Sequence, residues 1–242
     1  MTEDDSPVSS GSFSVVIGAG GGLGSALLAR LRQRGNPGRV IALGRSADIP
    51  INYFDEASIA HAAQAVASAC ASAGAELRLL LVASGFLHGQ AGQPERSWSQ
   101  LDAAYLHHVF TVNTFGPALV MKHFFPLLPK RGRCVAGFVS AKVGSIGDNA
   151  LGGWYGYRAS KAALNQLVKT AAIELTRRNR ESVCVALHPG TVDTLLSQPF
   201  SKAGLRVRSA DEAAGDLLGV LDQLSPAESG GLVDYRGHTL PF

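Results

Sequence analysis

Short apolar runs alternate along the chain with longer segments in which apolar and polar residues recur at helical spacing. The apolar runs predict buried strands at residues 13–17, 40–43, 77–82, 134–139 and 183–187, and weaker runs predict strands at 51–54 and 232–233. The segments between them predict helices at residues 22–35, 56–73, 99–128, 156–178 and 210–223. This alternation indicates an α/β fold in which helices cover both faces of a parallel sheet.

Local signals refine two of these helices. Ser209 and Glu212 have the spacing of a capping box at the start of the last helix. Gly116 and Pro117 are expected to bend or interrupt the helix at 99–128, because proline lacks the amide hydrogen that continues a helix.

The composition is typical of one globular domain. Of the 242 residues, 46% are hydrophobic and 17% are charged, which suffices for a substantial core. Since no internal repeat or linker divides the chain, we predict one domain at residues 13–242. The preceding residues, 1–12, are acidic and polar, unlike a signal peptide, and are expected to form a flexible tail.

Charge and cysteine usage limit the classes of partner. The net charge is +3 and the basic residues are scattered, which indicates an ordinary solvated surface and no nucleic-acid face. Cys70, Cys134 and Cys184 lack metal-ligand spacing and lie among apolar residues, as reduced thiols of cytosolic proteins do. No apolar run is long enough to span a bilayer. We therefore expect a cytoplasmic protein without a metal, membrane or nucleic-acid partner.

A glycine-rich turn lies between the first predicted strand and the first predicted helix. Gly18, Gly22 and Gly24 allow a sharp turn and a close approach of backbone to a pyrophosphate, while the helix N-terminus offers free N–H groups. The spacing is Gly-x-x-x-Gly-x-Gly, not the strict Gly-x-Gly-x-x-Gly. The turn predicts a dinucleotide site; the alternative is a flexible glycine turn without a ligand.

The residue after the second predicted strand bears on which dinucleotide would bind. An acidic side chain there bonds the ribose hydroxyls of NAD, whereas an arginine accommodates the 2′-phosphate of NADP. This chain has Arg45 after Gly44, which favours NADP(H) over NAD(H). The alternative is that Arg45 is a solvent-facing loop cation.

Tyr157 and Lys161 stand four residues apart within the helix predicted at 156–178, so both lie on one helix face. A phenol has a pKa of about 10, and a neighbouring ammonium lowers it. The pair is therefore suited to exchanging a proton with an alcohol or carbonyl oxygen.

With these features, the chain resembles the short-chain dehydrogenase/reductase family over residues 13–242. Four landmarks occur in the family's order: GAGGGLG at 18–24, VNTFGP at 112–117, YRASK at 157–161 and HPGTVDT at 188–194. The stretch at 144–167 and the ending GGLVDYRGHTLPF are similar to C-factor-type members and small carbonyl reductases. The resemblance implies a single Rossmann-type domain with a mostly parallel, seven-stranded, doubly wound sheet, and a homodimer or homotetramer.

The resemblance also implies roles for individual residues. It makes Tyr157 the acid/base, and Lys161 the residue that binds the nicotinamide ribose and lowers the pKa of the tyrosine. Asn113 would lie in a kinked helix whose carbonyl holds a proton-relay water. The resemblance assigns cofactor contacts to Gly18, Gly22, Leu23, Gly24, Arg45, Gly85, Lys161 and Thr194.

Two departures from the family pattern concern catalysis. The position of the family's catalytic serine falls on Ala141, and Ser140 should point to the other side of the strand because side chains alternate. Ser145 in the following loop is a second alternative donor. A missing hydroxyl would cost on the order of 3 kcal/mol, or about a hundredfold in rate. The family's Asn-Asn-Ala-Gly after the fourth strand is here Val-Ala-Ser-Gly, which keeps only Gly85.

These residues predict an NADP(H)-preferring oxidoreductase that reduces a carbonyl to an alcohol, or runs the reverse reaction. Because of Ala141, the alternative is a cofactor-binding signalling or regulatory protein with weak or no catalysis. A third alternative, NAD-linked alcohol oxidation, requires that Arg45 have no role. Trp154 and Phe200 border the expected substrate mouth, where they would line an apolar pocket or pack as core.

Overall fold

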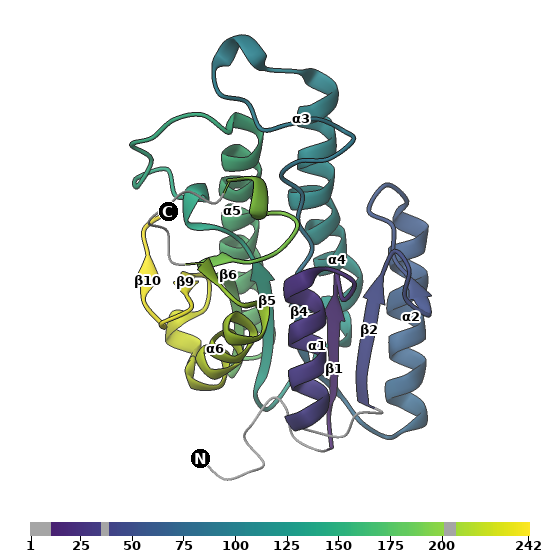
Figure 1. Cartoon of the computed structure of the whole chain (residues 1–242). Helices are drawn as coiled ribbons and strands as arrows, with labels where there is room; N and C mark the ends of the chain where they lie inside the picture. The colour runs from purple at the N-terminus through teal and green to yellow at the C-terminus, as the bar shows by residue number, and fades with distance from the viewer. Residues whose placement is uncertain (1–10, 35–38, 201–206) are drawn as a thin grey trace.

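The structure is a computed structural model that describes residues 11–34, 39–200 and 207–242 (Figure 1). All but the last two residues of the predicted tail at 1–12 lie outside these ranges. The strands are β1 (Phe13–Ile17), β2 (Val40–Gly44), β3 (Ile49–Pro50), β4 (Leu77–Val82), β5 (Cys134–Val139), β6 (Ser182–His188), β7 (Thr191–Val192), β8 (Val207–Arg208), β9 (Leu232–Asp234) and β10 (Thr239–Leu240). The α-helices are α1 (Gly22–Arg34), α2 (Glu56–Ser72), α3 (Ala103–Phe110), α4 (Gly116–Phe124), α5 (Tyr155–Arg178) and α6 (Ala210–Gln223).

Short helical turns complete the described chain. A π-helical turn, Thr111–Phe115, joins α3 to α4. Single 3-10 turns are found at Trp98–Gln100, Phe125–Leu127, Lys142–Gly144, Gln198–Phe200 and Pro226–Glu228.

The main sheet has the strand order β10-β9-β6-β5-β4-β1-β2-β3. Its seven strands from β9 to β3 are parallel to their neighbours, which confirms the predicted doubly wound α/β fold, and β10 adds an eighth strand antiparallel to β9. The chain order reverses between β1 and β4. In such sheets a ligand binds outside the carboxyl ends of the strands at this switch point.

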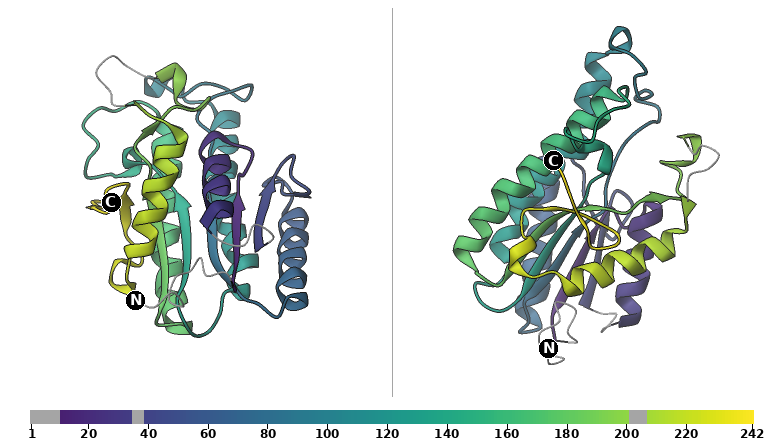
Figure 2. Two further views of the ribbon diagram at one scale, coloured as in Figure 1. Left: turned by 60° about the horizontal axis from the view of Figure 1, so that its bottom comes forward. Right: turned by 90° about the vertical axis from the view of Figure 1, so that its left-hand side faces the viewer.

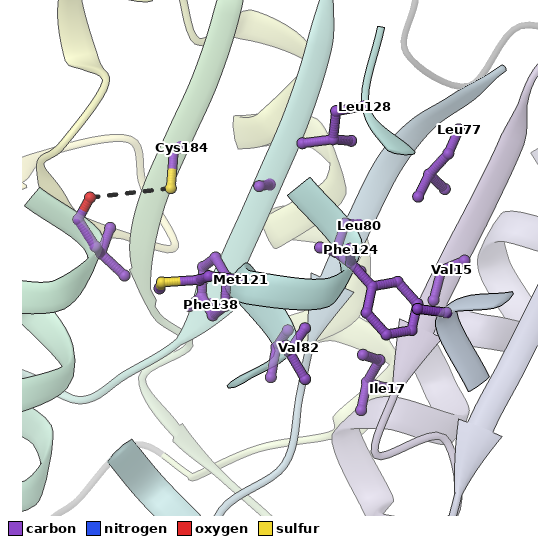
Figure 3. Close-up of a cluster of buried hydrophobic side chains, with 14 of the residues drawn as sticks. Val15, Ile17, Leu77, Leu80, Val82, Met121, Phe124, Leu128, Phe138 and Cys184 are labelled. Carbon is purple, nitrogen blue, oxygen red and sulfur yellow. Dashed lines mark hydrogen bonds between the residues drawn. The ribbon is translucent and has the colours of Figure 1, made fainter. Parts of the chain in front are cut away.

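Helices cover both faces of the sheet (Figures 1 and 2). Buried side chains of α2, α4 and α5 share one apolar cluster with β1, β4 and β5. Those of α1 and α6 form a second cluster on the opposite face. Figure 3 shows part of the first cluster, where Phe124 and Phe138 are fully buried and the Cys184 thiol approaches the carbonyl oxygen of Val168.

Two predicted elements differ from the structure. Residues 51–54 form no strand, because the side chain of Asn52 accepts the Phe54 amide and turns the chain after β3. The helix predicted at 99–128 begins only at Ala103, where Asp102 caps it, and is divided by the π-helical turn. The predicted capping box of Ser209 and Glu212 is present at the start of α6.

Candidate active site

The glycine turn leaves β1 at the switch point and enters α1. Gly18 has φ +84°, and a Cβ there would come within 2.7 Å of the Ser84 amide nitrogen after β4. A Cβ at Gly24 would collide with the Gly18 carbonyl oxygen, and one at Gly22 would lie 2.8 Å from the Thr194 methyl group. The turn therefore has room for backbone alone on these sides, as a pyrophosphate cradle requires.

The side chains next to this turn face different ways. Leu23 is buried in the cluster that packs α1 against α6, so only its backbone is available at the turn. Arg45 follows β2, is exposed, and forms no ion pair with any residue in the described ranges. Burial, with a smaller contribution from the Arg45 charge, lowers the pKa of His108, so Arg45 is the charged basic group of this pair near neutral pH. The surroundings fit an anion.

Tyr157 and Lys161 lie on the first two turns of α5, and both are buried. The Lys161 ammonium nitrogen donates to the Val139 carbonyl at the end of β5 over 2.8 Å and lies 5.9 Å from the centre of the Tyr157 ring. Burial raises the pKa of Tyr157 to about 12 and lowers that of Lys161 to about 7. The pKa of Tyr157 is therefore raised in this structure, not lowered as its spacing from Lys161 predicted, because burial disfavours the charged form of each group.

Asn113 lies in the π-helical turn and is fully buried. Its side chain accepts the Phe86 amide and donates to the Phe86 carbonyl and to the Ser160 hydroxyl, which ties the end of β4 to α5. Pro117 has no amide hydrogen, so the α-helical donor for the Asn113 carbonyl is missing. The predicted interruption at Gly116 and Pro117 thereby takes the form of a helix irregularity at Asn113.

Gly85 lies close to Asn113 and Lys161. A Cβ there would lie 3.8 Å from the Asn113 amide oxygen, the Lys161 nitrogen and a Leu196 methyl group. Thr194 begins a turn in which its carbonyl accepts the amides of Ser197 and Gln198. The structure therefore brings the residues predicted after β1, β4, β5 and β6 to one edge of the sheet.

Ser140, Ala141 and Ser145, the three residues considered for the serine position, have different surroundings in the structure. Ser140 donates to the Asn165 side chain over 2.6 Å, on the flank of α5 beyond Lys161. The Ser145 hydroxyl accepts the Asp148 amide within its own loop. Ala141, between them, has extended backbone and no polar side chain.

Sequence reasoning did not resolve the aromatic side chains above this site and overlooked one carboxylate. The rings of Trp154 and Phe200 are 5.1 Å apart, His88 is 5.3 Å from Phe200, and Trp154 is 6.1 Å from Tyr157. Glu95 is buried beside the start of α5. The loop sequence around Glu95 is polar, and nothing in it indicates burial.

Two negative findings apply to the described part of the chain. It contains no group of three or more His, Cys, Asp or Glu side chains placed to hold a metal ion. None of its helices has the length and apolar character needed to cross a membrane.

Comparison with known proteins identifies the family and supports the fold. The family model of short-chain dehydrogenases matches residues 13–204. C-signal of Myxococcus xanthus is 34% identical over 142 residues, which are 59% of this chain and 81% of that protein. An uncharacterized oxidoreductase of Schizosaccharomyces pombe is 30% identical over 213 residues, 81% of this chain and 79% of the relative. The crystal structure of NADPH-bound carbonyl reductase from chicken fatty liver has a TM-score of 0.82 and 26% identity, covering 95% of this chain and 98% of that chain.

Proposed function

This chain belongs to the short-chain dehydrogenase family, and we propose that it is a nicotinamide-dependent oxidoreductase that reduces a carbonyl to an alcohol. The observation that carries the proposal is the grouping of Tyr157, Lys161 and Asn113 beside Gly85, at the edge of the sheet where the glycine turn opens. The turn also fits a dinucleotide: Gly18 and Gly24 let it fold closely on itself and against the segment after β4, where Cβ atoms would meet backbone, and it leads into the N-terminus of α1.

A bound reduced nicotinamide would supply hydride to the carbonyl carbon. Tyr157 donates the proton that the carbonyl oxygen then requires. Because burial keeps the pKa of Tyr157 at about 12, the phenol is protonated near neutral pH and acts as an acid. The opposite reaction, alcohol oxidation, needs the phenolate, so its rate is expected to rise with pH above neutrality.

Lys161 and Asn113 support this proton transfer. The Lys161 nitrogen keeps one hydrogen on the Val139 carbonyl, and its remaining hydrogens are free for ribose hydroxyls of the cofactor. The Asn113 side chain is fully engaged with Phe86 and Ser160, so its contribution to a proton relay comes from its backbone carbonyl.

The test of this proposal is Tyr157→Phe, which removes only the acidic hydroxyl. We expect carbonyl reduction to fall by about 10²–10⁴-fold, while NADPH still raises the melting temperature as in the native protein. Tyr235→Phe serves as a control, because this tyrosine follows β9 and its ring packs against the Arg208 guanidinium. Native turnover in Tyr157→Phe would refute the assignment.

We further propose that NADP(H) is preferred over NAD(H), with Arg45 binding the 2′-phosphate. The unpaired, exposed guanidinium after β2 supports this, as does the NADPH found in the similar carbonyl reductase. Arg45→Ala should weaken NADPH binding at least tenfold, the value of one charge-assisted contact of about 1.5 kcal/mol or more, and leave NADH binding unchanged. Equal losses for both nucleotides would contradict the preference.

Ala141 is the reason to test how complete the catalytic set is. Ala141→Ser restores the family's hydroxyl at the end of β5. If the native site lacks one donor, turnover should rise by up to about a hundredfold. A regulatory protein without a carbonyl substrate would show no gain with any carbonyl tested, and the family membership does not favour that alternative.

Location and assembly are also part of the proposal. Two of the three free cysteines, Cys134 and Cys184, are buried among apolar side chains, which fits a reducing cytoplasm. A homodimer or homotetramer is supported by exposed apolar side chains on α5 and at the π-helical turn, Ile173 and Phe115, each 48% exposed. Light scattering on the purified protein measures the oligomeric state.

A further inference from the structure

The buried carboxylate of Glu95 lies against the first turn of α5, beside the residue that precedes Tyr157. Glu95 is 2% exposed, and both of its carboxylate oxygens accept the Gly156 amide, at 3.2 and 3.1 Å. Within the described ranges no basic side chain forms an ion pair with it. Burying a carboxylate is costly unless it is hydrogen-bonded, so this contact is the main compensation visible for the charge.

The residue that precedes α5 forms no side-chain cap for the helix. Trp154 occupies the N-cap position, makes no side-chain cap bond, and has a left-handed backbone with φ 54°. It is the one described residue other than glycine with positive φ. Such a conformation is strained for a bulky side chain and persists only where its surroundings hold it.

Glu95 provides that support through its backbone as well as its side chain. The Trp154 amide donates to the Glu95 carbonyl over 2.5 Å, and the Gly156 amide donates to the carboxylate. The Trp154 indole is thereby held against Phe200 and beside Tyr157. Glu95 thus holds both the N-cap residue Trp154 and Gly156, the residue that precedes Tyr157, from a loop that is distant in sequence.

The space around this contact leaves little freedom. A Cβ at Gly156 would lie 3.0 Å from a Leu106 methyl group, 3.1 Å from a Glu95 carboxylate oxygen and 3.3 Å from the Tyr105 ring. Tyr105 is itself anchored, because its hydroxyl donates to the Leu87 carbonyl over 2.7 Å. The helix start is therefore packed against α3 and the loop after β4 on the side that carries Glu95.

We propose that Glu95 is a positioning residue of the active site: it holds the first turn of α5 so that the Tyr157 hydroxyl and the Trp154 indole meet the substrate. The proposal rests on the proposed function, in which Tyr157 is the acid. A serine or aspartate at position 154 could cap α5 locally, but it would neither present an indole to the substrate nor tie the helix to the loop at 86–102. Glu95 supplies the cap from outside, which leaves position 154 to an aromatic side chain.

The test compares two conservative variants. Glu95→Gln keeps an oxygen at the distance of Gly156 and removes the charge, whereas Glu95→Asp keeps the charge and withdraws the oxygens by about one carbon–carbon bond, roughly 1.5 Å. We expect Glu95→Gln to retain kcat within about threefold of the native value. Since a displacement of about 1 Å at a catalytic group can cost on the order of a hundredfold, Glu95→Asp should lower kcat about ten- to a hundredfold. The NADPH dissociation constant should stay within about threefold in both variants.

Two further variants keep the test decisive. Glu212→Gln alters a carboxylate that caps α6 away from the site and should lower the melting temperature without changing kcat. Gly156→Ala adds a methyl group that would crowd the Glu95 carboxylate, and it should lower kcat several-fold. This variant replaces Glu95→Asp in the test if Glu95→Asp does not fold. A kcat within threefold of native in the folded Glu95→Asp or, failing that, in Gly156→Ala would overturn the proposal.

The outcome is separable from that of the proposed function. If Tyr157→Phe retains turnover, the acid assignment fails whatever Glu95 does. If Tyr157→Phe is inactive and Glu95→Asp behaves like Glu212→Gln, only the positioning role fails.

Discussion

Lys161→Met should make the ligand-free protein more stable at neutral pH while it abolishes catalysis. The substitution replaces the buried ammonium with an apolar group of similar length on the same turn of α5. It also leaves the Val139 carbonyl without its donor, which costs about 1–3 kcal/mol. This loss is opposed by a gain in stability, because the substitution removes a charged group whose burial is unfavourable.

The magnitude follows from the pKa of Lys161, which burial lowers from its usual 10.5 to about 7. Between these two values the unfolded chain holds a proton that the folded chain has released, so native stability rises with pH. The penalty is fully present below pH 7 and is relieved as the pH approaches 10.5. Between pH 7 and about 9.5 the relief is about 3 kcal/mol, at about 1.4 kcal/mol per pH unit. The stability of Lys161→Met relative to native protein should fall by that amount over this range.

The assay is urea unfolding of cofactor-free protein, followed by circular dichroism at several pH values between 6 and 9.5. Taking the difference between variant and native protein cancels the other groups that titrate in this range. Lys122→Met is the matched control, because Lys122 is exposed and pairs with Glu56. Parallel stability curves for Lys161→Met and native protein would refute the reasoning, since they would mean that Lys161 keeps an ordinary pKa in the fold.

Two further predictions concern the turn that leads into α1 and the start of α6. Gly24→Ala should abolish the NADPH-induced rise in melting temperature and lower the melting temperature itself, because its Cβ would meet the Gly18 carbonyl oxygen. Gly219→Ala, in α6 and with open space for a Cβ, should do neither. Ser209→Ala removes the acceptor of the Glu212 amide and should cost about 1 kcal/mol in urea unfolding, with unchanged kcat.

The fold was predictable because its strands are buried on both faces and read as continuous apolar runs. The runs at 13–17, 77–82 and 134–139 coincide with β1, β4 and β5. The failure at 51–54 has a local cause, since Asn52 turns the chain by accepting the Phe54 amide and outweighs the apolar character of its neighbours. Side-chain hydrogen bonds of this kind compete with strand pairing, and apolar patterning does not register them.

The relative positions of the candidate site residues were predictable where one local segment determines them. The helical spacing of Tyr157 and Lys161 places both near the start of α5, and the glycine spacing gives the turn after β1. The direction of the two pKa shifts was not accessible, because it depends on how many atoms exclude water from each group. The sequence spacing indicates that the two side chains are neighbours, but their pKa values in the folded protein depend on burial, which the spacing does not reveal.

The placement of α5 depends on contacts between segments that are distant in sequence. α5 is tied to the helix irregularity by Asn113 and Ser160, to the end of β5 by Ser140 and Asn165, and to the loop after β4 by Glu95. These ties flank Tyr157 on both sides along the helix. Each involves a buried polar group, whose burial costs free energy unless its hydrogen-bond partner is in place. The hydrogen bonds therefore favour one position of α5 over others. The same burial that fixes the helix also keeps the Tyr157 phenol protonated, which links the rigidity of α5 to the proposed role of Tyr157 as a proton donor.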